Sequence, residues 1–184
     1  MSDSKNTSTE LATKWNVRYQ YSKEQSKPTP EPATLLAEYV DFLPASGDAL
    51  DLAAGRGGNA RLLAANQLNT HAWDISSVAM QELKSDVPSI HAVVRDVTEN
   101  PPEPNSFDVI VVSRFLDRSL CSAIQDALRV DGVLFYQTFT SGLSNPEFML
   151  KPNELLELFS ELQVLVYLES VSGSESGLIA SRIC

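Results

Sequence analysis

Residues 48–59 read Asp-Ala-Leu-Asp-Leu-Ala-Ala-Gly-Arg-Gly-Gly-Asn, and this stretch decides the fold. Its apolar part, Ala49 to Ala53, predicts a short buried strand, the glycines predict a loop, and Ala60 to Ala65 predicts a helix. A strand, a glycine loop and a helix form the first half of a βαβ unit that can hold a nucleotide. The start of the helix offers unpaired backbone N–H groups to a carboxylate or a phosphate.

The composition of the chain limits the classes of protein to which it can belong. The chain has 184 residues, 43% of them hydrophobic, which is enough for one domain with a full core. Its formal net charge of −10 argues against unaided binding to nucleic acid or an anionic membrane, because both need basic patches. Cys121 and Cys184 suggest no disulfide framework, and no Cys/His cluster has zinc spacing, so no metal is expected. Because no run is long enough for a membrane span and Met1 to Glu10 lacks a signal-peptide core, we expect a cytoplasmic protein.

The chain divides into three expected segments. Residues 1–9 are rich in Ser and Thr and predict a disordered tail. Residues 10–46 hold two amphipathic helices, over 10–20 and 33–43, which are joined by a proline-rich linker and cover the site. Residues 47–184 form the main domain, in which strands are expected at 49–53, 70–73, 90–94, 107–112, 133–139, 164–168 and 178–183. Helices are expected at 60–65, 76–85, 120–130 and 152–162, the third ended by Asp131-Gly132.

The order of these elements predicts the fold class. Alternation of strands and helices through the first five strands implies a parallel sheet with right-handed crossovers. Only a small polar turn separates the last two strands, so they must form a hairpin. We therefore expect an α/β fold with a Rossmann-like, doubly wound, seven-stranded sheet that is mostly parallel and has one antiparallel strand in the C-terminal hairpin.

This pattern resembles the class I S-adenosylmethionine-dependent methyltransferases. Residues 50–57 are similar to the first motif of that family, an acid followed by Gly-x-Gly-x-Gly, and residues 127–134 resemble its step into the fifth strand. Within the family, the chain looks closest to the small tellurite-resistance branch. Further similar stretches are Trp15-Asn16-Val17-Arg18-Tyr19, Gly57-Gly58-Asn59, Trp73-Asp74-Ile75-Ser76, Arg95-Asp96-Val97, Phe107 to Val112, and Pro152-Asn153-Glu154-Leu155-Leu156.

The resemblance implies S-adenosyl-L-methionine as the cofactor. Asp51 would orient its amino group, Asp74 would accept its ribose hydroxyls, and Asp96 with the N–H of Val97 would hold the adenine. Other roles stay open, because Asp51 could cap the N–H groups of its own loop, Asp74 could cap the helix near Ser76, and Asp96 could be a solvated acid. The other expected cofactor residues are Trp15, Arg18, Ala53, Gly55, Gly57, Asn59, Ile75 and Ser113.

Ala53 departs from the family pattern, which usually has glycine at this position. Glycine there lets the backbone approach the methionine end of the cofactor, and alanine adds one methyl group. Cofactor binding is therefore expected to be unchanged or tighter after Ala53→Gly.

The segment from Ser113 to Arg118 follows the fourth strand, where methyl acceptors bind in this fold. It lacks the Asn/Asp-Pro-Pro-aromatic sequence that is usual in amino-methyltransferases acting on nucleobases. Arg114 and Arg118 could hold an anionic acceptor or could form structural salt bridges. Tyr19 and Phe139 are the other residues expected on the acceptor side.

No catalytic residue is predicted. His71 and His91 are the only histidines, and both begin strands, which places them at the opposite edge of the sheet from the site. A chalcogen nucleophile (S, Se or Te) or another anionic small molecule fits this lack of a histidine base, because such an acceptor needs little general-base help. The expected partner is therefore a small molecule, with no nucleic acid and no membrane, and the oligomeric state is not predicted.

Two other functions remain open. One is an S-adenosylmethionine-binding protein without catalysis, which Ala53 and the missing base favour. The other is an NAD(P)-dependent reductase, because residues 55–60 also fit Gly-x-Gly-x-x-Ala. Asp51 argues against the reductase, since a carboxylate beside a pyrophosphate is electrostatically unfavourable.

Overall fold

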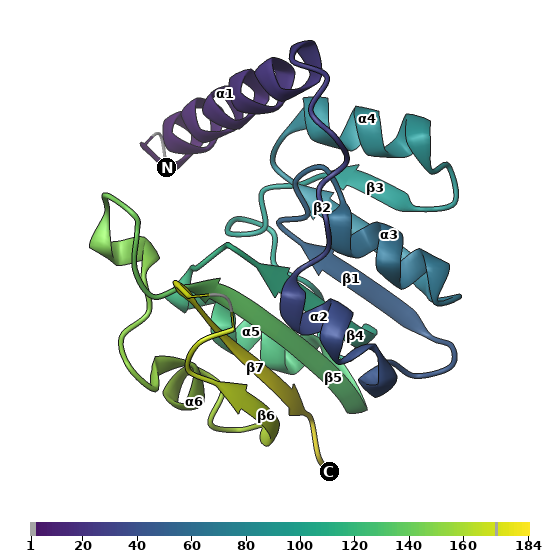
Figure 1. The fold of residues 1–184 in the computed structure, drawn as a ribbon, viewed down its shortest axis with the longest axis vertical. Helices are drawn as coiled ribbons and strands as arrows, with labels where there is room; N and C mark the ends of the chain where they lie inside the picture. Colours follow the sequence, from purple (N-terminus) through teal and green to yellow (C-terminus); the bar gives the residue numbers. More distant parts are fainter. Residues whose placement is uncertain (1–2, 172) are drawn as a thin grey trace.

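A seven-stranded sheet organises the chain, with strand order β3-β2-β1-β4-β5-β7-β6. The computed structural model describes residues 3–171 and 173–184. Strands β1 to β5 pair in parallel, and β7 runs antiparallel to both β5 and β6. Helices cover both faces of the sheet (Figure 1). The predicted Rossmann-like fold is confirmed, including its antiparallel strand in a C-terminal hairpin.

The strands and helices have the following bounds. The strands are β1 (Asp48–Leu52), β2 (Asn69–Asp74), β3 (His91–Val94), β4 (Phe107–Ser113), β5 (Leu128–Phe139), β6 (Gln163–Leu168) and β7 (Glu175–Ser181). The α-helices are α1 (Asp3–Glu24), α2 (Thr34–Glu38), α3 (Gly58–Ala65), α4 (Ser77–Asp86), α5 (Cys121–Ala127) and α6 (Glu154–Leu158). Three 3-10 turns complete them: η1 (Val40–Phe42), η2 (Arg118–Leu120) and η3 (Pro146–Phe148).

Two apolar layers hold the sheet between its helices. Leu50 and Ile110 point into the layer under α5 and α6, while Ala49 and Val111 point into the layer under α2 and α3. Strand β4 is buried on both faces, which explains its almost continuous run of apolar residues. The sheet is therefore a rigid support for the loops at its ends.

The junction between α5 and β5 differs from the sequence prediction. The helix ends at Ala127 and β5 begins at Leu128, so the expected helix to Val130 with a stop at Asp131-Gly132 is wrong. Leu128 pairs with Phe107, but the register then shifts, which marks a bulge over the residues in between. A Cβ added at Gly132 would lie 2.8 Å from the Arg129 carbonyl oxygen, so the glycine serves the bulge rather than a helix end.

Other boundaries moved as well, and the helix expected at 152–162 is the shorter α6. Helix α1 begins at Asp3, inside the segment for which the sequence predicted a tail, and Met1 and Ser2 lie outside the described residues. Helix α2 ends at Glu38 and gives way to the turn η1. Strand β7 begins at Glu175, earlier than the expected start at Leu178. The earlier start of β7 places the carboxylate of Glu175 in the sheet.

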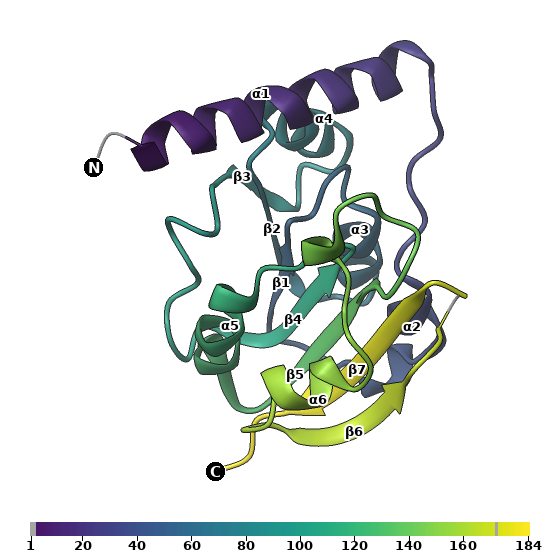
Figure 2. The same cartoon turned by 90° about the vertical axis from the view of Figure 1, so that its left-hand side faces the viewer.

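The parallel strands all end at one edge of the sheet, called the carboxyl edge below. Because β7 is antiparallel, its first residue lies at this edge too, where Glu175 pairs with Phe139 at the end of β5. Helix α1 crosses above the carboxyl edge (Figure 2). Within residues 3–171 and 173–184, no helix combines the length and the apolar composition that crossing a bilayer requires.

Candidate cofactor and acceptor site

Asp74 ends β2 and links the glycine loop to the start of α4. Its Oδ2 accepts a hydrogen bond from the Gly55 N–H (2.8 Å), and its Oδ1 accepts one from the Ser76 N–H (2.8 Å). Burial raises the pKa of Asp74, although these two bonds oppose the shift. A carboxylate has about four acceptor positions, so Asp74 keeps capacity for two further donors. The N-cap of α4 is Ser76 itself, whose hydroxyl accepts from the Ala79 N–H (3.2 Å).

Asp51 lies beneath the same loop, at the end of β1, and is fully buried. Its oxygens accept from the Ala60 N–H (2.9 Å) and from Nδ2 of Asn59 (3.1 Å). Burial raises the pKa of Asp51 to about 7, and the nearby Asp74 adds to the shift against these two hydrogen bonds. Asp51 thus caps the first turn of α3, and its charge interacts unfavourably with that of Asp74.

Asn59 connects four segments of the chain at this point. Besides its bond to Asp51, its Nδ2 donates to the hydroxyl of Ser113 at the end of β4 (2.9 Å). Its Oδ1 accepts from the Ala33 N–H, just before α2 (2.8 Å). The amide is buried, so it fixes the ends of β1 and β4 relative to α3.

Three backbone N–H groups in the glycine loop and the first turn of α3 donate to acceptors within the chain. The N–H groups of Gly55 and Ala60 donate to the two carboxylates, and the N–H of Gly57 donates to the Ala54 carbonyl (2.9 Å). In a dinucleotide site such N–H groups face the phosphates. The loop geometry therefore favours a ligand that brings donors over one that brings phosphate.

Ala53 adopts a backbone conformation that suits glycine. Its φ is +56°, in the left-handed region that costs a non-glycine residue about 1–2 kcal/mol. The usual glycine of the family thus has a conformational reason at this position, in addition to the close approach expected from the sequence. The fold therefore accommodates Ala53 at the cost of a strained backbone.

We expect Ala53→Gly to raise the free energy of unfolding by about 0.5–1 kcal/mol, because relief of the left-handed strain exceeds the entropy that glycine adds to the unfolded chain. Urea denaturation measures this change. The matched control is Ala54→Gly, at a neighbour whose φ is not positive, which should lose stability. Equal losses of stability in both variants would show that the backbone of Ala53 is not strained. Calorimetric titration with S-adenosylmethionine should show unchanged or tighter binding.

Tyr19 of α1 lies against the glycine loop. A Cβ added at Gly55 would be 2.8 Å from the Tyr19 hydroxyl, so only glycine leaves room for the tyrosine there. Tyr19 stacks on Trp15 with ring centroids 5.6 Å apart, and the Arg18 guanidinium lies 5.0 Å from the Trp15 ring centroid. Burial, reinforced by the charge of Asp74, raises the pKa of Tyr19. The phenol therefore stays protonated at neutral pH and does not act as a base.

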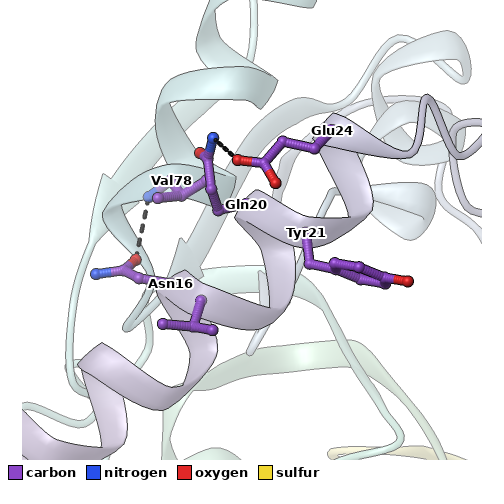
Figure 3. Close-up of a pocket in the computed structure, with 6 residues that line it drawn as sticks. Asn16, Gln20, Tyr21, Glu24 and Val78 are labelled. Atoms are coloured by element: carbon purple, nitrogen blue, oxygen red, sulfur yellow. Dashed lines mark hydrogen bonds between the residues drawn. The ribbon is translucent and has the colours of Figure 1, made fainter.

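Helix α1 is anchored by polar side chains at two points. Oδ1 of Asn16 accepts from the Ser76 hydroxyl (2.7 Å) and from the Val78 N–H (3.2 Å), so it caps the start of α4 from outside (Figure 3). The Ser8 hydroxyl donates to Asp96 (2.5 Å). A shallow groove of about 470 Å³ lies between α1 and α4 and includes none of the strand-end residues. It is lined by Asn16, Val17, Gln20, Tyr21, Glu24 and Val78.

We expect Asn16→Ala to loosen α1 by about 1 kcal/mol, as for the loss of a helix cap. Hydrogen exchange of the α1 amides should then speed up about fivefold relative to wild type. Gln20→Ala is the control, because Gln20 is exposed and bonds only to Glu24 of the same helix among the described residues. Equal exchange in the two variants would show that Asn16 does not hold the helix.

The segment between α1 and α2 packs on the glycine loop. The Arg56 guanidinium donates to the carbonyls of Pro28 (3.0 Å) and Lys27 (3.2 Å). A Cβ at Gly58 would lie 2.6 Å from the Glu31 carbonyl oxygen. This segment is fixed to the loop by its backbone, independently of the bonds made by α1.

Asp96 follows β3 and is held by neighbouring hydroxyls. It accepts from Thr98 Oγ1 (2.7 Å) as well as from Ser8. Partial burial acts to raise the pKa of Asp96, but these hydrogen bonds together hold it below its usual value. Val97, beside it, is buried in the core under α5. Ile75 and Phe139 are half-buried at the ends of β2 and β5.

The two candidate acceptor arginines differ in what they bind. Nε and Nη2 of Arg118 donate to Glu154 (2.6 and 3.0 Å), and its other bonds go to the carbonyls of Glu147 and Met149 (2.6 and 3.0 Å). Arg118 thus forms the structural salt bridge that the sequence left open. The Nε of Arg114 donates to Glu175 (2.7 Å), and among the described residues its Nη atoms make no hydrogen bond.

Sequence reasoning missed Glu175 and Gln137, which hold Arg114. Both are buried, and the Nε2 of Gln137 donates to Glu175. A glutamine within the apolar run of residues 133–139 was the available signal, because a polar side chain in a buried strand requires partners. Glu175 gave no such signal, since it was expected in a solvated turn.

The histidines lie where their positions at the strand starts predicted. His71 and His91 pair in register near the starts of β2 and β3, with ring centroids 4.9 Å apart. This is the edge of the sheet opposite Asp51 and Asp74. Partial burial, together with the neighbouring His91, lowers the pKa of His71.

Part of the chain matches a known family. Residues 49–132 match the model of a family described as "Methyltransferase domain". This match spans the glycine loop, Asp74, Asp96 and Arg114. No curated protein matches the chain.

Solved structures share the fold over most of the chain. A TehB-like SAM-dependent methyltransferase from Corynebacterium glutamicum is 16% identical, with a TM-score of 0.70, over 95% of this chain and 99% of that one. TehB from Haemophilus influenzae is 18% identical, with a TM-score of 0.69, over 88% of this chain and 65% of that one. An S-adenosylmethionine-dependent methyltransferase from Mesorhizobium loti is 12% identical, with a TM-score of 0.67, over 82% and 98%. The predicted resemblance in fold is confirmed, and the structures that share this fold include TehB and a TehB-like methyltransferase.

Proposed function

We propose that this chain is a class I S-adenosylmethionine-dependent methyltransferase and that it methylates a small anionic or chalcogen-containing acceptor. The match to a methyltransferase domain over residues 49–132 and the fold shared with solved methyltransferases support this proposal. When bound, S-adenosylmethionine supplies a methyl group on a sulfonium sulfur, and an acceptor lone pair takes that carbon while the sulfur keeps the electron pair of the broken bond. The protein contributes orientation and the exclusion of water.

The two buried carboxylates support this cofactor. Asp74 has acceptor capacity left for the ribose hydroxyls, and Asp51 offers a negative charge to the ammonium group of the methionine part. The engaged N–H groups of Gly55, Gly57 and Ala60 count against an NAD(P) pyrophosphate. We therefore assign the carboxyl edge to S-adenosylmethionine, with Trp15 and Tyr19 of α1 above it.

The position of the histidines carries the proposal for the acceptor. Both lie at the edge opposite the carboxyl edge, and the high pKa of Tyr19 keeps the phenol protonated. Asp51, with a pKa of about 7, is fully buried and already bonds to Asn59 and Ala60, so it is poorly placed to take a proton from an acceptor. A thiolate, a selenide or a chalcogen oxyanion needs no such base.

Arg114 supports an acceptor with negative charge. Its side chain is 57% exposed at the carboxyl edge. The chain as a whole carries a charge of −10, so an anion approaching this edge needs a local cation to compensate. Arg118 does not supply one, because its donors are used by Glu154 and two carbonyls.

Isothermal titration of the folded protein with S-adenosylmethionine and S-adenosylhomocysteine tests the cofactor. Absence of binding heat at millimolar cofactor would refute it, and quenching of tryptophan fluorescence by NADH alone would favour the reductase. Incubation with thiols, selenite and tellurite, followed by detection of S-adenosylhomocysteine, tests the acceptor class. Tight binding without turnover across that panel would instead support a protein that binds the cofactor without catalysis.

A further inference from the structure

Glu175 is a buried carboxylate at the carboxyl edge to which nothing above assigns a function. It is 4% exposed, and it lies at this edge because β7 is antiparallel to β5. Its Oε1 accepts from the Nε of Arg114 (2.7 Å), and its Oε2 accepts from the Nε2 of Gln137. Both carboxylate oxygens are thereby fixed in position.

Gln137 in turn is fixed by the backbone of α2. Its Oε1 accepts from the Leu35 N–H (2.8 Å), and its side chain is 2% exposed. The Gln137 carbonyl also accepts from the Arg114 N–H (2.8 Å). Both the backbone and the guanidinium of Arg114 are therefore tied to the buried network formed with β5 and β7.

The conformation of Arg114 indicates that its side chain is needed there. Its φ is +54°, a left-handed conformation that glycine would adopt without the cost of about 1–2 kcal/mol. Such strained residues persist where the surroundings over-determine them, and they cluster at functional sites. An arginine at this position pairs through Nε alone, which leaves both Nη groups at the exposed end of the side chain.

The burial of Glu175 argues against a purely structural pair. Taking a carboxylate out of water costs several kcal/mol, a cost that a pair at the surface does not carry. An acid that merely stabilised a surface arginine would be more favourable at the surface, as in the pair of Arg61 with the half-exposed Asp86 (2.9 Å). The network instead holds a guanidinium in one orientation, which is what bidentate recognition of an oxyanion requires.

We propose that Glu175, supported by Gln137, is a positioning residue that aims the Nη groups of Arg114 at an oxyanion of the methyl acceptor. The inference rests on the proposed function and narrows it to acceptors that combine a chalcogen nucleophile with an oxyanion. For a thiol of this kind, the S–H proton goes to solvent, the sulfur lone pair forms the S–CH₃ bond, and the cofactor leaves as neutral S-adenosylhomocysteine.

The test compares 2-mercaptoethanesulfonate with 2-mercaptoethanol, two thiols that differ in the oxyanion. Glu175→Gln should raise KM for the sulfonate about 10-fold or more, with kcat within about threefold and KM for mercaptoethanol unchanged. Arg114→Gln should do the same, and the double variant should add nothing further, because Glu175 acts through Arg114. Equal changes with both thiols, or additive losses, would overturn the proposal.

Glu154→Gln is the matched control, since it breaks the corresponding ion pair of Arg118, whose three guanidinium nitrogens each bond to the chain. It should not distinguish the two thiols. A second measurement, binding of 2-mercaptoethanesulfonate to the protein loaded with S-adenosylhomocysteine, is independent of turnover. Weaker binding by Glu175→Gln, with unchanged binding by Glu154→Gln, supports the proposal, and unchanged binding by Glu175→Gln overturns it. Failure of the wild-type protein to bind S-adenosylhomocysteine refutes instead the cofactor assignment on which the proposal rests.

Discussion

Asp74→Ala is expected to raise the dissociation constant for S-adenosylmethionine by about 100-fold or more and to lower the free energy of unfolding by about 3 kcal/mol. Both effects have one cause. The carboxylate accepts hydrogen bonds from the N–H groups of Gly55 and Ser76, so its removal leaves two donors without their acceptor. It also removes the group that we propose as the acceptor for the ribose hydroxyls. Calorimetric titration and urea denaturation measure the two losses.

Asp86→Ala is the control for Asp74→Ala. It removes an exposed carboxylate from the end of α4, where the only described ion pair is with Arg61, so stability should change by about 0–1 kcal/mol and cofactor binding not at all. The stability and the cofactor affinity of Asp74→Asn should lie between those of wild type and Asp74→Ala. An amide keeps one acceptor oxygen, but it turns its own N–H group toward a backbone N–H group. A folded Asp74→Ala protein that binds the cofactor as wild type does would disprove the assigned role.

Asp51→Asn is expected to gain stability relative to wild type as the pH rises. Asp51 has a pKa of about 7 in the fold against 3.8 in the unfolded chain, so between these values the folded state holds the extra proton. Wild-type stability therefore falls with rising pH through this window, by about 1.4 kcal/mol per pH unit from this group. Asparagine does not titrate, so the difference between the proteins should grow from pH 5 to 6.5 and level off above about 7.

The same variant should lose cofactor affinity, since an amide offers no charge to the ammonium group. At pH 8 we expect about a 10-fold higher dissociation constant. In wild type at pH 6.5 the ammonium should lower the pKa of Asp51 and release a fraction of a proton on binding. Calorimetry in buffers of different ionisation enthalpy detects this release. A stability difference that is flat with pH, or proton release that persists in Asp51→Asn, would rule out Asp51 as the titrating group.

The local part of the site could be predicted from the sequence. Asp51 and Asp74 stand directly at strand ends, and the glycines between them require a loop, so neighbouring residues alone place these groups together. Roles that depend on long-range pairing could not be predicted. Arg118 has no local signal for its bond to Glu154, and the end of α5 depends on Leu128 pairing with Phe107.

The backbone conformation and the burial of single residues also could not be predicted from the sequence. Ala53 was recognised as unusual, but its φ of +56° follows from the turn that the whole loop makes. Glu175 was expected in a polar turn, because polar residues before a strand are usually solvated. Its burial follows from the register in which β7 pairs with β5. The order of polar and apolar residues around Glu175 does not predict that register.

The attachment of residues 27–31 to the glycine loop has a kinetic consequence. Because these residues are fixed by Arg56 and lie against Gly58, α1 can leave the carboxyl edge only by pivoting at the chain just before them. In the proposed arrangement the product lies beneath α1, so the helix has to move away before the product leaves. We therefore expect product release to limit the turnover rate. The turnover rate should then fall as the solvent viscosity rises, and it should be higher in Asn16→Ala than in wild type.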